Sequence, residues 1–116
     1  MAVPATPEFL RLARVTAAGL ASRLGFTFDD VDDLRLAIDE LCFALIGAKG
    51  RQGTVQLRYV VSGDVLEVVG SGHFDDAGPA PKLNDFSAQI LDALVDEHEL
   101  STADGQPRFR LVKRRP

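Results

Sequence analysis

The sequence of 116 residues has one cysteine and no tryptophan, and it lacks a long apolar run. The single cysteine, Cys42, excludes an internal disulfide framework and a metal site built from clustered cysteines. A helix that crosses a bilayer needs about 20 consecutive apolar residues, which this chain does not offer. Residues 1–10 also lack the basic region and apolar stretch of a secretory signal. These absences predict a cytoplasmic protein that is not inserted in a membrane.

Basic residues are in the minority as well. Thirteen Lys and Arg residues stand against 17 Asp and Glu residues, which gives a net charge of −4. Proteins that bind nucleic acids generally depend on neutralising phosphates, so this balance argues against direct nucleic-acid binding. The charges are unevenly placed, with an acidic cluster at residues 29–33 and a basic one at residues 108–115. The basic cluster is either a solvated end of the chain or a site for an acidic partner.

The composition, 46% hydrophobic and 26% charged, is typical of a globular domain. A chain of this length buries about two-thirds of its surface on folding, so we expect residues 1–116 to form a single domain. Helical periodicity predicts helices over residues 7–24, 30–48 and 85–95. The expected apolar stripe of the first is Phe9, Ala13, Ala17, Leu20 and Leu24. The second should be buried on two sides, through Val31, Leu34, Ile38, Leu41 and Leu45 and through Leu36, Ala37, Phe43 and Ala44. The third, capped by Asn84 or Asp85, should bury Phe86, Ile90, Ala93 and Leu94.

A period of two predicts strands elsewhere in the chain. These strands are expected over residues 54–61, 65–69, 97–102 and 108–113, with a glycine-rich and proline-rich loop over residues 70–83. Two helices followed by antiparallel strand pairs predict an α/β (α+β) two-layer sandwich. We expect a mixed sheet of four to five strands with three helices on one face.

Glu40 is the chemically unusual residue, because its helical neighbours are apolar. A carboxylate in such surroundings is a candidate for a functional site, and the alternative is a glutamate at the rim of the helix with its charge in water. The segment Gly70-Ser71-Gly72 after a strand fits either a phosphate cradle or a turn. Neither histidine has a partner at the spacing of a metal site, so no metal site is expected.

The segment from Pro4 to Glu40 resembles bacterial anti-sigma-factor serine kinases of the GHKL ATPase superfamily, of the RsbW and SpoIIAB type. The resemblance rests on Ala-Arg-Val-Thr-Ala at residues 13–17 and Asp-Leu-Arg-Leu-Ala-Ile-Asp-Glu at residues 33–40. It extends through residues 91–97 and 109–114, and so over nearly the whole chain. It implies the fold of a GHKL or histidine-kinase-type ATPase.

The resemblance also implies what has happened to a nucleotide site. In the family, a glutamate of the central helix activates the attacking group and an asparagine four residues later holds Mg²⁺. Glu40 matches the glutamate, as a general base or its vestige, whereas Ala44 stands at the asparagine position and cannot coordinate a metal. In the family's Asp-x-Gly-x-Gly box the aspartate reads adenine; Gly70 stands at that aspartate and Gly72 at a glycine.

The third box of the family is a glycine-rich turn into a helix, which brings backbone N–H groups to the phosphates. Its glycines correspond here to Asp85 and Ser87. We therefore expect a degenerate nucleotide site and no cofactor, with ATP and Mg²⁺ bound only if the protein is an active kinase.

Partner binding is the remaining implication. In the family, an arginine of the first helix helps to engage the sigma factor and the anti-anti-sigma antagonist. Arg14 matches this arginine, and Arg11 lies one turn before it; from the residues alone, Arg14 is equally a solvated helix residue. The leading hypothesis is a regulatory protein of the anti-sigma-factor type. The alternatives are an active ATP-dependent serine kinase and an interaction domain without a transcriptional role. Members of this family often pair as dimers, which makes a homodimer compatible with the resemblance.

Overall fold

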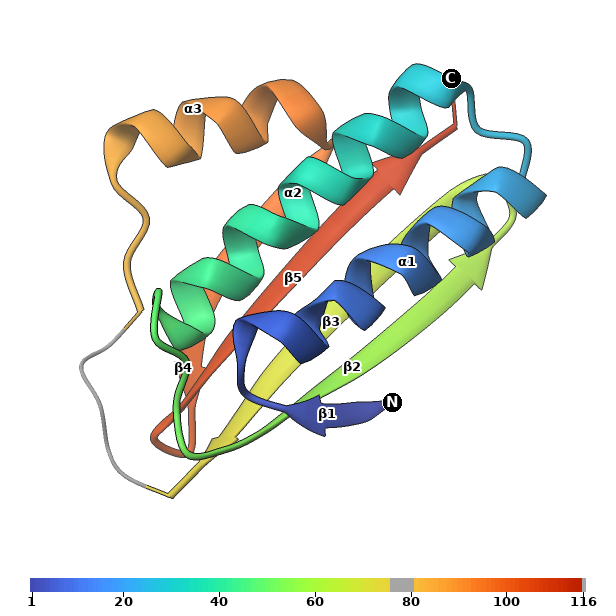
Figure 1. Cartoon of the computed structure of the whole chain (residues 1–116). Coiled ribbons are helices and arrows are strands. Elements are labelled where there is room, and N and C mark those ends of the chain that lie inside the picture. Colours follow the sequence, from blue (N-terminus) through green and yellow to red (C-terminus); the bar gives the residue numbers. More distant parts are fainter. Residues whose placement is uncertain (76–80, 116) are drawn as a thin grey trace.

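The computed structural model describes residues 1–75 and 81–115, in which three helices lie over one face of a five-stranded sheet (Figure 1). The helices are α1 (Pro7–Arg23), α2 (Phe28–Ile46) and α3 (Asp85–Leu94). The strands are β1 (Ala2–Pro4), β2 (Gly53–Ser62), β3 (Val65–Phe74), β4 (Glu97–Ala103) and β5 (Gln106–Arg114). Helix α2 lies between α1 and α3 in the helical layer (Figure 1). The predicted two-layer α+β sandwich is confirmed.

The strands follow the order β1-β2-β3-β5-β4 across the sheet, and each neighbouring pair is antiparallel. The expectation of a mixed sheet is therefore wrong for these strands. Strand β5 follows β4 through a turn and lies between β4 and β3. It runs antiparallel to both of these strands. Strand β1 was not predicted, because three residues show no periodicity. It is held at the edge by pairing with β2, where Val3 stands opposite Val55.

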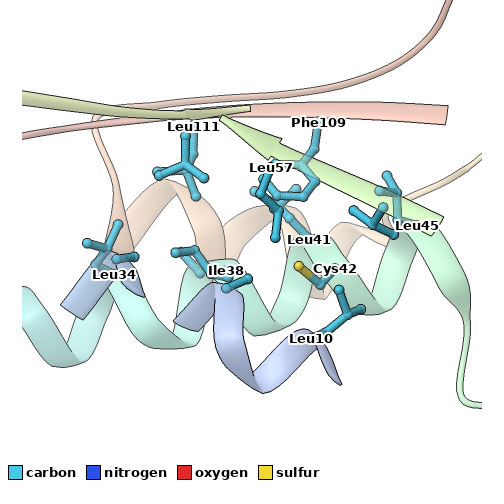
Figure 2. Close-up of a cluster of buried hydrophobic side chains, with 14 of the residues drawn as sticks. Leu10, Leu34, Ile38, Leu41, Cys42, Leu45, Leu57, Phe109 and Leu111 are labelled. Carbon is cyan, nitrogen blue, oxygen red and sulfur yellow. The ribbon is translucent and has the colours of Figure 1, made fainter. Parts of the chain in front are cut away.

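The core lies between α2 and the sheet (Figure 2). The predicted stripe of α2 is buried at Leu34, Ile38, Leu41 and Leu45. These side chains meet Leu57 of β2 and the fully buried Phe109 and Leu111 of β5 (Figure 2). Residues four apart on a helix share one face, whereas alternate residues of a strand do so. The apolar residues that the helical and strand periods identify in the sequence therefore pack against each other between α2 and the sheet.

Helix α1 buries a stripe that differs from the predicted one. The buried residues are Leu10, Ala13, Ala17 and Ala21, and Phe9 is 42% exposed. Two neighbouring stripes share Ala13 and Ala17, so spacing alone cannot choose between them. The alanine stripe lets α1 lie close to its neighbours, and the Tyr59 hydroxyl on β2 donates to the Ala13 carbonyl at 2.9 Å. Thr6 stands at the N-cap of this helix, and its hydroxyl makes no capping hydrogen bond.

The outer side of the helical layer is more apolar than the sequence analysis expects. Leu36 and Phe43 on α2 are 55% and 57% exposed, and Phe86 on α3 is 71% exposed. The prediction that these three residues are buried is wrong. A helix that lies on one face of a sheet buries one side only, because no further layer covers the other. No helix in the described part of the chain is long and apolar enough to cross a membrane.

Candidate functional site

Glu40 and Ala44 lie one turn apart on α2, so they share one side of this helix. Both are partly exposed. Glu40 makes no hydrogen bond or ion pair with any residue in 1–75 or 81–115, which is compatible with a glutamate at the rim of the helix. The side chain of Ala44 is a methyl group, which offers no oxygen to a metal ion. The α2 side of the predicted nucleotide site thus has a carboxylate and lacks the second oxygen ligand.

Gly70 and Gly72 lie within β3, and the prediction that they begin a loop is wrong. Both are paired with β2, and both are buried on the helix side of the sheet. A Cβ atom on Gly70 would stand within 2.2 Å of the Phe109 ring, and one on Gly72 within 2.5 Å of the Phe74 ring. These glycines therefore make room for two aromatic rings. After β3, residues 75 and 81–83 of the predicted loop form no helix or strand, and residues 76–80 lie outside the described residues.

The beginning of α3 is closed by a side chain. Asn84 caps the helix as predicted, and its side-chain oxygen accepts a hydrogen bond from the Ser87 backbone N–H at 2.7 Å. This N–H belongs to the turn that the resemblance assigns to phosphate binding. Asp85 adds a carboxylate in the first turn of the helix. A polar side chain and a negative charge thus occupy the place where a phosphate would need free donors.

The predicted partner-binding arginines lie one turn apart on α1, but only Arg14 is paired with an acidic residue. The Arg14 guanidinium donates from Nη1 to Asp39 on α2 at 2.9 Å. Its Nε is buried and has no acceptor among the described residues. Arg11 is exposed and makes no hydrogen bond or ion pair within residues 1–75 and 81–115. Arg11 is therefore the free cation of the pair, and Asp39 is a neighbour that the sequence analysis did not single out.

A pocket of about 370 Å³ opens between the first half of α1 and the last turns of α2. Both arginines and Asp39 contribute to its wall, and Phe43 contributes an exposed aromatic ring. Cys42 also lines it, with Leu10 from α1 beside it (Figure 2). Burial, and secondarily the charge of Asp39, raises the pKa of the Cys42 thiol to about 12, so the thiol is neutral. Cys42 is a free cysteine that belongs to the buried core.

The basic cluster at the end of the chain is paired within the molecule. The buried Lys113 ammonium donates to the Leu94 carbonyl at the end of α3 at 2.6 Å. It also lies 3.6 Å from Asp30 and 3.8 Å from Asp33 in the first turns of α2. One cation thus joins β5 to the end of one helix and the beginning of another. The acidic and basic clusters that the sequence showed separately meet in this contact.

The other face of the sheet holds further pairs. The Arg110 Nε donates to Glu67 at 2.7 Å, and Glu97 accepts from Arg110 at 3.3 Å and from Arg114 at 3.0 Å. Hydrogen bonds from Arg110 and then Arg114 lower the pKa of Glu97, and the bond to Glu67 raises the pKa of Arg110. These basic residues are therefore partly neutralised by acidic residues of the same chain.

Comparison with known proteins identifies relatives that are named serine-protein kinase RsbW. No protein-family model matches the chain. The serine-protein kinase RsbW of Bacillus pumilus is 30% identical over 127 residues, which covers 90% of this chain and 78% of that protein. RsbW of Bacillus subtilis is 33% identical over 100 residues, which covers 84% of this chain and 62% of that protein. RsbW of Halalkalibacterium halodurans is 37% identical over 70 residues, which covers 60% of this chain and 43% of that protein.

Proposed function

The chain belongs to the RsbW family of serine-protein kinases, and on this premise we propose that it is a regulatory protein of the anti-sigma-factor type with a degenerate nucleotide site. It acts by binding a sigma factor or an anti-anti-sigma antagonist through the α1 surface that carries Arg11 and Arg14. The chain spans 62% of the B. subtilis relative, so kinase activity is not carried over with the family name.

The observation that supports the degenerate site best is the cover over Gly70 and Gly72. The rings of Phe109 and Phe74 stand where these glycines would have to approach a nucleotide. Ala44 offers no ligand for Mg²⁺, and Asn84 occupies a donor at the beginning of α3. The residues present therefore do not fit ATP and Mg²⁺.

Thermal unfolding with and without Mg-ATP tests this part of the proposal. A ligand at 100 times its Kd stabilises the folded state by about 2.7 kcal/mol, which raises Tm by several degrees in a domain of this size. We expect no change in Tm at millimolar Mg-ATP. We also expect none for Ala44→Asn, because this substitution restores one metal ligand and leaves both glycines covered. A rise of several degrees in the wild type would contradict the degenerate site.

An active ATP-dependent serine kinase is the second candidate, and it is favoured by the relatives' name and by Glu40. Glu40 would serve as the general base, and the Mg²⁺ would need ligands other than residue 44. Incubation with ATP labelled at the γ-phosphate, together with purified anti-anti-sigma proteins of the same genome, separates the two. Phosphate transfer that is lost in Glu40→Gln would establish the kinase.

Partner binding needs a separate experiment. Purified sigma factors and anti-anti-sigma proteins of the same genome are titrated against the wild type, Arg14→Ala and the control Arg23→Ala. Arg23 is exposed in the last turn of α1, away from the pocket. We expect Arg14→Ala to weaken binding and Arg23→Ala to leave it unchanged. If no sigma factor or antagonist binds the wild type, the chain is better described as an interaction domain without a transcriptional role.

A further inference from the structure

The pocket between α1 and α2 combines an apolar floor with a charged rim. Leu10, Cys42 and Ile46 form the floor, and all three are buried. The Cys42 thiol is neutral, so the floor carries no charge. The volume of about 370 Å³ lies near the lower end of the range of known ligand pockets, about 300–1,000 Å³. The space suits one large apolar group.

An unusual aromatic side chain stands at the entrance. Phe43 is 57% exposed although it lies on the central helix of the domain. Leu36, two turns earlier on α2, is 55% exposed on the same side of the helix, and the partly exposed Asp39 and Glu40 lie in the turn between it and Phe43. Exposed apolar surface next to a pocket is typical of a binding site for another protein. Aromatic residues are also enriched among those that dominate binding energies.

The pocket walls carry two arginines, Arg11 and Arg14, and two carboxylates, Glu8 and Asp39, and both arginines keep donors that a further carboxylate can reach. Arg11 has no counter-ion among the described residues, and Arg14 has one ion pair and a buried Nε without an acceptor. The side chains of Arg14 and Asp39 are 30% and 45% exposed, so this ion pair is accessible to a competitor. Ion pairs at such positions contribute little to stability, so a carboxylate from outside can replace Asp39 at low cost.

We propose that this pocket receives a large apolar side chain from an acidic segment of a partner protein, with Asp39 acting as a built-in competitor for that segment's carboxylate. The carboxylate pairs with Arg11 and displaces Asp39 from Arg14, while the apolar side chain packs on the floor against Phe43. The proposal rests on the proposed function in so far as it places the partner on the same face of α1. It adds the chemistry of the partner and a residue that limits affinity.

Charge favours a different protein over a second copy of this chain. In a two-fold symmetric contact, each copy would present the same surface to the other. Such a contact would bring a second set of Arg11 and Arg14 into the interface, and it would supply only Glu8 and Asp39 as acidic residues from the pocket walls. An acidic segment from another protein supplies new counter-ions for Arg11.

Random short peptides displayed on phage are the probe, because they presuppose no partner. The whole protein is immobilised, and enriched peptides are synthesised and titrated by fluorescence polarisation. We expect enriched peptides to combine Asp or Glu with an aromatic or branched aliphatic residue. Phe43→Ser should weaken their binding about tenfold, as expected for a residue that dominates an interface. The matched control is Phe28→Ser, because Phe28 at the beginning of α2 is 81% exposed and lies outside the pocket.

Asp39→Asn gives the sharpest readout, because it should strengthen binding. Removing the competitor's charge frees Arg14, and we expect affinity for the acidic peptides to rise about two- to fivefold at low salt. If Asp39 only supported the fold, Asp39→Asn would weaken the binding of these peptides or abolish it. Arg11→Gln should abolish the preference for acidic peptides, and Arg23→Gln should not. Circular dichroism of each variant checks that it is folded.

Several outcomes would overturn the proposal. These are enriched peptides without acidic residues, binding that Phe43→Ser leaves unchanged, and affinity that falls in Asp39→Asn. Analytical ultracentrifugation covers the second-copy alternative: dimers that dissociate in Phe43→Ser would make this chain its own occupant. A sigma factor that binds the wild type and Phe43→Ser equally would refute the pocket and leave the proposed function standing. If acidic peptides bind the pocket but no sigma factor or antagonist binds the protein, the proposed function is refuted and the pocket proposal stands.

Discussion

Replacing Lys113 by methionine should destabilise the protein more than the same replacement of an exposed lysine. Lys113 is 7% exposed, and its ammonium lies at the meeting point of α2, α3 and β5. Methionine preserves most of the length of the apolar stem and removes the charge and the donor. The substitution therefore isolates the polar contribution of Lys113 from its packing.

The contacts of the ammonium set the expected magnitude. Without it, the Leu94 carbonyl loses its donor, which costs about 1–3 kcal/mol for a buried group. The Asp30 and Asp33 side chains, 17% and 37% exposed, lose their common cation at 3.6 and 3.8 Å. Because both carboxylates keep contact with water, this loss costs about 1 kcal/mol, less than the about 3–5 kcal/mol for breaking a fully buried pair. We expect a loss of about 2–4 kcal/mol in the free energy of unfolding.

Urea unfolding followed by circular dichroism measures this loss. With a slope of about 2 kcal/mol per molar urea, which is typical of small proteins, the midpoint should fall by about 1–2 M. Lys49→Met is the control, because Lys49 is exposed and forms no ion pair with any described residue. Asp30→Asn in the Lys113→Met background should recover part of the loss, since an amide needs no counter-ion. If Lys113→Met and Lys49→Met differ by less than about 0.5 kcal/mol, the reasoning is refuted.

Three further predictions concern glycine and cysteine positions. Gly70→Ala should cost about 1–3 kcal/mol, because its Cβ would meet the buried Phe109 ring, and Phe109→Leu should recover part of this in urea unfolding. Gly19→Ala, where a Cβ meets nothing within 4 Å, should raise Tm by about 2–5 °C, and an unchanged or lower Tm would contradict this. The raised pKa of Cys42 keeps the folded thiol protonated, so stability should fall as pH rises from about 9 towards about 12, where the unfolded thiol ionises first. Cys42→Ala should show a shallower fall over this range.

The periodic elements could be predicted because they depend on local spacing. The α2 stripe through Leu34, Ile38 and Leu41 is fixed by residues on one helix, and the structure buries it as expected. Strand β1 escaped prediction, since it is held by pairing with β2, which lies about 50 residues further along the chain. The stripe of α1 was misplaced for a related reason. Whether Phe9 or Leu10 is buried depends on neighbours that spacing does not reveal.

In the candidate site, too, local features could be predicted and contacts between distant residues could not. Arg11 and Arg14 could be singled out from a segment of α1, whereas the contact of Arg14 with Asp39 joins residues 25 positions apart. Phe43 was assigned to the core because an apolar residue on a central helix is usually buried. Only the arrangement of the layers shows that its side of α2 is uncovered.

The glycines of β3 link the fold to the proposed loss of nucleotide binding. A glycine approached by a ligand and a glycine approached by an aromatic ring both need an empty Cβ position, so the sequence cannot distinguish them. In this chain the space at Gly70 is taken by Phe109, which is fully buried and contacts the core beneath α2. Opening that space for a ligand would remove a large side chain from the core, a change that costs about 3–5 kcal/mol. The stability of the fold therefore opposes a return of the nucleotide site, while the exposed surface of α1 carries no such constraint.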